Sequence, residues 1–195
     1  MQDLPSNLAL PPDQPGKVVV IDTKTDTVTD VVTLQGKNPT NMVFSPKTGM
    51  LYVSEADFND PTSATEGVEV IDPTTLKSGG FLVTSSTLGG STGDIEVYES
   101  TGYVTVGFFD MTTSTFITKI DSFSLDSSSS AAPMEIYRSN AFLQDMAISS
   151  DGLLLIGDRA PAVSGVVIYD TAKAAVVAGP INAGPAPSSI TFIDL

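Results

Sequence analysis

The sequence predicts an all-β protein built from repeated units, and three observations lead to this prediction. Four similar segments end in Asp, namely KVVVID at Asp22, GVEVID at Asp72, FITKID at Asp121 and GVVIYD at Asp170. Their spacings are 72 − 22 = 50, 121 − 72 = 49 and 170 − 121 = 49 residues. Ser, Thr, Gly, Pro and Val crowd the chain, which is typical of short strands joined by tight turns. Pro, Gly and β-branched residues interrupt every window long enough for a helix.

A second segment repeats in the other half of each unit. NMVFSPKTGMLYVS begins at Asn41, DIEVYESTGYVTVG at Asp94, DMAISSDGLLLIGD at Asp145 and SITFIDL at Ser189. The three longer copies each read as a strand, a turn containing Gly and a second strand. A β-rich unit of this length is typical of a propeller blade. The sequence therefore predicts a β-propeller of about four blades, each with four antiparallel strands.

The four strands of a unit are called a to d in chain order. For the first unit they are expected at Lys17–Asp22, about Thr27–Leu34, Asn41–Ser45 and Met50–Glu55. The second unit follows with about Val68–Asp72, Phe81–Thr84, Asp94–Tyr98 and Tyr103–Gly107. The third is expected at Phe116–Asp121, Met134–Tyr137, Asp145–Ser149 and Leu153–Gly157. The fourth has Val166–Asp170, Ala175–Val177 and Ser189–Ile193, with no d strand after it.

The chain is expected to form one domain, 1–195, with units at about 17–56, 67–110, 115–158 and 165–195. SNLAL at Ser6–Leu10 stands where a d strand stands in other units and is expected to act as one. It would then complete the last blade and close a small ring. The alternative, which we favour because four blades make a tight ring, is a slice of a propeller of about seven or eight blades. A dimer or missing blades would then supply the rest.

Composition excludes several classes of function. The balance of 9 basic against 23 acidic residues gives a net charge of −14, which repels the phosphate backbones of nucleic acids and anionic membranes. A cation or a basic protein partner fits such a surface, although acidity also simply favours solubility. The chain has no Cys and no His, which removes thiol chemistry, the usual general base and the commonest metal ligand.

The N-terminal sequence MQDLPSNLALPPDQPG lacks the basic and apolar regions of a signal peptide. LLLI at Leu153–Ile156 is typical of the longest apolar runs, which are far too short to span a membrane. We therefore expect no membrane insertion. Any export signal would lie outside this sequence.

The segment GKNPTNMVFSPKTGMLYVSEA (36–56) resembles a YVTN-family β-propeller repeat, and 17–39 matches the first half of that repeat. The third and fourth units match in part. The second matches least, since Tyr98-Glu99 stands where Ser45-Pro46 stands in the first. The resemblance implies a propeller fold and an extracellular, cell-surface or periplasmic location. It implies no single activity, because relatives include both surface proteins and lactonase-like propellers.

Four polar residues stand at the same position, the start of strand c. They are Asn41, Asp94, Asp145 and Ser189. If the blades surround an axis, these side chains recur near the mouth of the channel. Oxygen ligands of this kind suit Ca²⁺ or another divalent cation, and some lactonase-like propellers are said to bind metal nearby. The alternative is that these side chains satisfy backbone groups at strand ends.

Three further patterns favour structural roles. The Asp residues that end strand a are expected to form Asx or Ser/Thr turns; they are Asp22, Asp72, Asp121 and Asp170. The G-x-S-x-G pattern at 89–93 lacks a His base and a following helix, so a loop is expected there. A cluster of Asp57, Asn59, Asp60 and Glu66 does not follow EF-hand spacing and favours a solvated loop.

The sequence favours a non-catalytic propeller of the cell exterior that binds a protein or a small ligand on one face, with no cofactor required. The alternative is a metal-dependent, lactonase-like hydrolase, in which a bound cation polarises a carbonyl without any His. A third reading is a subunit that docks on a redox partner.

Overall fold

The computed structural model describes residues 15–56, 65–126, 128–129 and 131–192. The described chain is all-β apart from one helical turn. Its strands are β1 (Lys17–Asp22), β2 (Thr27–Thr33), β3 (Pro39–Ser45), β4 (Met50–Glu55), β5 (Gly67–Asp72), β6 (Lys77–Thr84), β7 (Ser91–Tyr98), β8 (Thr101–Asp110), β9 (Thr115–Ser124), β10 (Met134–Ser139), β11 (Leu143–Ile148), β12 (Leu153–Asp158), β13 (Gly165–Asp170) and β14 (Ala175–Ile181). The predicted fold class is confirmed as all-β and antiparallel. The expected strand at 6–10 lies outside the described residues.

The strands form three four-stranded antiparallel sheets and one hairpin. The sheets are β3-β4-β5-β6, β7-β8-β9-β10 and β11-β12-β13-β14, and the hairpin is β1-β2. Each four-stranded sheet therefore takes strands c and d of one sequence unit and strands a and b of the next. The prediction that strands a to d of one unit share a blade is wrong. The repeat spacing fixes the period of the chain, but it does not fix where a sheet begins within that period.

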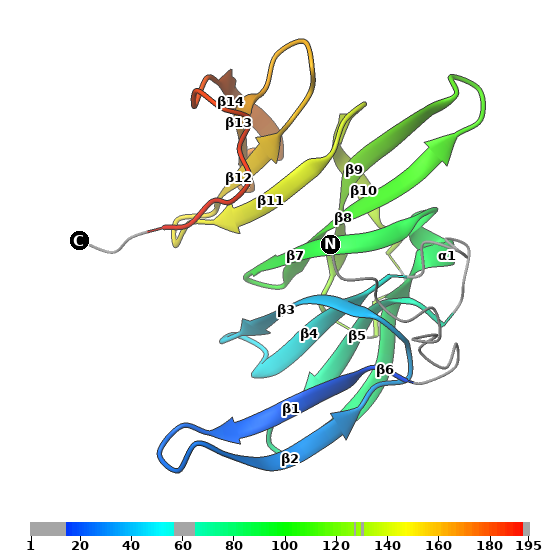
Figure 1. Ribbon diagram of the computed structural model, residues 1–195, viewed down its shortest axis with the longest axis vertical. Coiled ribbons are helices and arrows are strands. Elements are labelled where there is room, and N and C mark those ends of the chain that lie inside the picture. Colours follow the sequence, from blue (N-terminus) through cyan, green and yellow to red (C-terminus); the bar gives the residue numbers. More distant parts are fainter. Residues whose placement is uncertain (1–14, 57–64, 127, 130, 193–195) are drawn as a thin grey trace, which may run out of the picture.

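The sheets follow one another along an arc and do not close into a ring (Figure 1). The hairpin β1-β2 lies at one end of the long axis, and β13 and β14 lie at the other. The first strands of the three sheets face one another, with β7 packed against both β3 and β11. We call β3, β7 and β11 the inner strands. The arrangement resembles successive blades of a propeller, and the arc is open on one side.

Apolar side chains fill each junction between neighbouring sheets. Val53 and Ile71 pack with Val32 and Leu34 of the hairpin region in one buried cluster. Further clusters join the first four-stranded sheet to the second and the second to the third. Because both faces of the central sheets are covered, their strands read as continuous apolar runs, as the sequence indicated.

Three of the four predicted Asp turns share one local structure. Oδ1 of the strand-ending Asp accepts the backbone N–H two residues on, from Lys24 to Asp22 (2.8 Å), from Thr74 to Asp72 (2.8 Å) and from Ala172 to Asp170 (3.0 Å). These bonds confirm the turns predicted at three of the four positions.

Asp121 does not form the turn predicted for it. It lies three residues inside β9, is 2% exposed, and pairs with Lys119 (2.7 Å). The strand instead ends at Ser124, which pairs with Thr101 at the start of β8. Ser124 Oγ accepts the N–H of Asp126 (3.1 Å), so a Ser turn replaces the Asp turn. The sequence missed this because β9 continues beyond the KID segment.

Two other expectations differ from the structure. The segment Ser189–Phe192 forms no strand, and no strand among the described residues pairs with it. Ile193 lies outside the described residues. A single helical turn, α1 (Ser85–Leu88), stands just before the G-x-S-x-G segment, where no helix was expected. Thr84 caps its N-terminus, and Gly89 ends it in the left-handed conformation with φ 78°.

Candidate functional site

Three of the four predicted polar residues lie on the inner strands, each at an irregularity of the strand pairing. Asn41 follows a register shift in β3, and Asp94 and Asp145 lie within shifts in β7 and β11. Such an irregularity interrupts the regular ladder and changes the direction of nearby side chains. The sequence alignment therefore placed three of its four candidates at one structural position.

These side chains bond across the junctions between sheets. Asp94 Oδ2 accepts the backbone N–H of Met146 on β11 (2.6 Å). Asp145 Oδ2 accepts the N–H of Ile190 (2.5 Å) in the same way. The same type of contact thus recurs in two successive sheets, although Ile190 lies in the segment after β14 and not in a strand. We call these two contacts the junction bonds.

Two other predicted residues complete the row. Asn41 donates from its side-chain amide to Asp94 Oδ1, which also accepts the N–H of Ile95 (3.0 Å). Ser189 lies beside Ile190, but among the described residues no hydrogen bond from its own side chain links it to the row. The structure therefore brings Asn41 and Asp94 into direct contact and joins Asp145 to the residue next to Ser189.

Burial shapes the charge of this row. It raises the pKa of Asp94 to about 6, with a smaller rise from the charge of Asp145, and the hydrogen bond from Met146 opposes the shift. Glu96, two residues further along β7, has a pKa raised to about 7 by burial and then by the charges of Asp94 and Asp145. Sequence analysis missed Glu96, because it has no counterpart in the first unit, where Val43 stands.

A hollow of about 250 Å³ adjoins Asp94. Hydroxyl groups of Thr92 and Thr105 and the rings of Phe116 and Phe142 contribute to its wall. The two rings are 5.0 Å apart, centre to centre. Among the described residues, its wall carries no basic side chain that could hold an anion.

The predicted calcium site gains no support from the geometry. Among the described residues, no group of three or more Asp, Glu, His or Cys side chains is arranged to hold a metal ion. Two of the predicted ligands direct a carboxylate oxygen at a backbone N–H group instead. Calcium binding therefore stays a prediction. The alternative, that these side chains accept hydrogen bonds from backbone groups, is supported by two specific contacts.

A second acidic cluster was not expected from the sequence. Glu55, Glu66 and Glu69 are buried, with exposed fractions of 0%, 1% and 0%. Glu69 accepts the N–H groups of Gln35 (2.9 Å) and Gly36 (3.3 Å), which follow the hairpin. The available signal was Glu69 itself, a charged residue inside the apolar segment GVEVID, where the first and fourth units carry Val.

Glu55 lies against Glu69 without a hydrogen-bond donor from the described residues on either carboxyl oxygen. Burial raises the pKa of Glu55 to about 9, and the charges of Glu69 and Glu66 and a carboxyl–carboxyl hydrogen bond to Glu69 add to the rise. At neutral pH Glu55 is therefore protonated and can donate to Glu69. Of the oxygen-rich loop noted in the sequence, only Glu66 belongs to this cluster; Asp57, Asn59 and Asp60 lie outside the described residues.

The G-x-S-x-G segment has no catalytic geometry. Ser91 opens β7 and is 4% exposed, so the predicted loop is wrong for 91–93, which belong to a strand. The chain has no His to activate the hydroxyl.

Comparisons with known proteins add little. No family model matches the chain, and no curated protein is similar enough to count as a relative. Among solved structures, Sqt1 of Chaetomium thermophilum superposes with a TM-score of 0.48 at 16% identity, covering 84% of this chain and 40% of that one. The chain thus spans less than half of that protein. A likeness at this level establishes neither a family nor a function for this chain. The YVTN resemblance stays a prediction. No helix in the described part of the chain is long and apolar enough to cross a membrane.

Proposed function

We propose that this chain forms part of a β-propeller of the YVTN-repeat type and acts as a non-catalytic binding or scaffold surface. The observation that supports this proposal is the use of the inner-strand carboxylates. Asp94 accepts a backbone N–H of the next sheet and so ties two sheets together, whereas Asp145 accepts a backbone N–H of the segment after β14 and ties that segment to the last sheet. Carboxylates that accept such backbone hydrogen bonds stabilise a rigid frame, and the oxygens involved are not free to act on a ligand.

The acidic surface supports a basic partner. A net charge of −14 attracts cationic groups and speeds their encounter with the protein. We therefore propose a protein or small ligand with basic groups, bound on one face of the propeller. An exported or cell-envelope location is part of the proposal and rests on the family resemblance alone.

The alternative, a metal-dependent lactonase-like hydrolase, makes a different prediction for calcium. The test is a thermal unfolding series with added CaCl₂, compared with NaCl of equal ionic strength, followed by a lactone hydrolysis assay. We expect both salts to shift the melting temperature equally, since only screening is at work, and no lactone turnover. A saturable shift specific to Ca²⁺ that Asp94→Asn abolishes, together with turnover, would establish the hydrolase and overturn the scaffold.

A further inference from the structure

We propose that two copies of this chain associate head to tail, with the free face of hairpin β1-β2 in one copy packed on the free face of sheet β11–β14 in the other. The proposal rests on the propeller arrangement proposed above and specifies one partner for it. It stands on a comparison of equivalent positions in successive sheets.

The free face of the hairpin carries an exposed side chain at a position that is buried in the three four-stranded sheets. Ile21 is the next-to-last residue of β1 and is 57% exposed. The next-to-last residues of β5, β9 and β13 are Ile71, Phe123 and Tyr169, which are 1%, 5% and 4% exposed. Cross-strand pairing with Ile21 and Val19 puts further exposed valines on the same face, namely Val28 (60%) and Val31 (47%).

The opposite end of the arc has a free apolar face of the complementary kind. Leu155 is the third residue of β12, and Val166 is the second residue of β13; both are only half-buried. Their equivalents in the first four-stranded sheet, Tyr52 and Val68, are 1% and 0% exposed. Ile181 of β14 pairs with Val166 and is 49% exposed.

The two free faces match because an internal junction already joins faces of these two kinds. Tyr52 and Val68 of the first four-stranded sheet pack in one cluster with Val104 and Phe123 of the second. Phe123 occupies the position of Ile21, and Tyr52 that of Leu155. Stacked repeats use the same contacts at every junction, so the last unit leaves free the surface that the first unit leaves uncovered. A second copy of the chain therefore supplies a face of the kind that the internal junction already uses.

The two faces cannot meet within one chain, since they lie at opposite ends of the long axis (Figure 1). Two copies would bring together 2 × 3 = 6 four-stranded sheets and two hairpins, within the range of about four to eight units known for propellers. Head-to-tail contacts that close in this way form a ring, not a filament. Each copy carries a net charge of −14, so electrostatic repulsion opposes the contact. Added salt should strengthen the contact by screening this repulsion.

The first measurement is the mass in solution by light scattering, over a range of protein and salt concentrations. The mass of one chain is 20.3 kDa, so a pair has 2 × 20.3 = 40.6 kDa. We expect the 40.6 kDa species to grow with protein concentration and with added NaCl. A mass of 20.3 kDa under every condition would overturn the pairing and leave the calcium result, which tests the scaffold itself, untouched.

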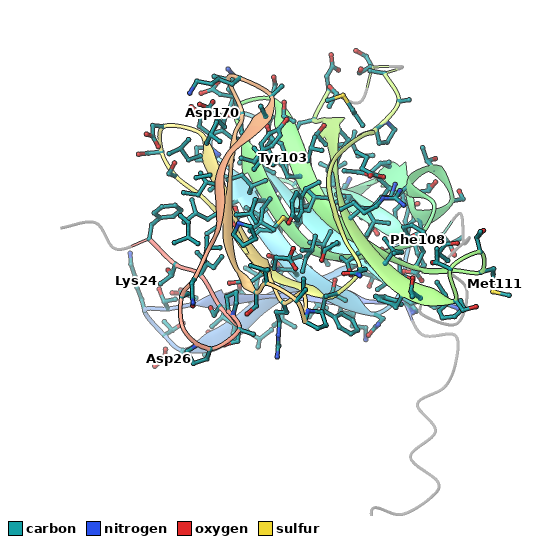
Figure 2. The ribbon with its side chains drawn as sticks, turned by 90° about the horizontal axis from the view of Figure 1, so that it is seen from above. Lys24, Asp26, Tyr103, Phe108, Met111 and Asp170 are labelled. Carbon is teal, nitrogen blue, oxygen red and sulfur yellow. The ribbon has the colours of Figure 1, made fainter. Side chains whose placement is uncertain are left out.

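Substitutions at exposed sites then test the head-to-tail geometry. We expect Ile21→Glu and Ile181→Glu each to raise the dissociation constant at least tenfold. At protein concentrations where the chain is monomeric, the melting temperature should not change, because both side chains are about half exposed. The control is Met111→Glu, at the β8–β9 turn, which is 82% exposed, projects outward in Figure 2 and lies away from both free faces.

Mixing the two end variants separates head-to-tail contact from self-pairing of one face. An equimolar mixture retains one unaltered interface, between the hairpin of the Ile181→Glu copy and the last sheet of the Ile21→Glu copy. We therefore expect the mixture to recover the 40.6 kDa species. A homodimer that survives Ile181→Glu, or a mixture that stays monomeric, would overturn the head-to-tail contact.

Discussion

At the residue scale, the repeated polar position of the inner strands was predictable from the sequence. The role of its side chains was only partly predictable. Alignment of the repeats placed Asn41, Asp94 and Asp145 together, because one bulge recurs in each inner strand. It could not decide between a cation site and backbone bonding, since that depends on which N–H group faces each carboxylate. Glu55 was missed because its burial and its contact with Glu66 and Glu69 appear only in the folded chain.

Glu55 makes the stability of the fold depend on pH. Its pKa in the folded protein is raised to about 9 from 4.5, so its contribution is fully present below about pH 4.5 and is lost as the pH rises toward 9. Over that interval we expect this group to lower the free energy of unfolding by up to about 1.4 kcal/mol per pH unit. Urea unfolding at a series of pH values from about 5 to 9 measures it.

The variant Glu55→Gln mimics the protonated form and should flatten this dependence. The matched control is Asp30→Asn, which removes an exposed carboxylate of β2. Parallel stability curves for the unaltered protein and Glu55→Gln would show that the buried carboxyl group carries no proton at neutral pH.

At the element scale, strand positions followed from apolar runs and turn residues, but the grouping of strands did not. Met50–Glu55 was predicted with the bounds that the structure has. The sheets nevertheless join strands across the unit boundaries. The length of a connection does not decide this grouping, because β4 and β5 pair across residues 56–66, whereas β10 and β11, separated only by residues 140–142, lie in different sheets. The same reasoning failed for Ser124, since a Ser turn has a weaker sequence signal than an Asp turn.

The shared hairpin turn contains a strained position that can be relieved. Ala174 ends the turn after Asp170 with φ 51° and is exposed. The left-handed conformation costs a residue with a Cβ atom about 1–2 kcal/mol, and Gly adopts it freely. After allowing for the greater freedom of Gly in the unfolded chain, we expect Ala174→Gly to stabilise the protein by about 0.5–1 kcal/mol.

Ala172→Gly is the control for this prediction, because Ala172 lies in the same turn without a positive φ. It should be neutral or destabilising by up to about 1 kcal/mol. Chemical denaturation of both variants makes the comparison. Equal effects at the two positions would contradict the assignment of strain to Ala174.

At the scale of the whole molecule, the sequence predicted repeated antiparallel sheets, and the structure adds how they meet. Neighbouring sheets meet through apolar junctions and through the bond from Asp94 to Met146, and Asp145 holds the segment that follows the last sheet. Whether an arc closes depends on the angle between successive sheets, which no sequence pattern encodes. The exposure of Ile21 is likewise visible only once the arc is known.

The bond from Met146 N–H to Asp94 Oδ2 tests most directly whether the inner-strand carboxylates hold neighbouring sheets together. Amide hydrogen exchange should be measured in the unaltered protein, in Asp94→Ala and in the exposed control Asp30→Ala. Loss of a buried acceptor costs about 1–3 kcal/mol, so we expect Met146 to exchange about ten- to hundredfold faster in Asp94→Ala. The amide of Val104, in the middle of β8, should change far less. Unaltered exchange at Met146 would contradict a structural role for Asp94. Asn41, Asp94 and Asp145 would then again be candidates for binding a ligand.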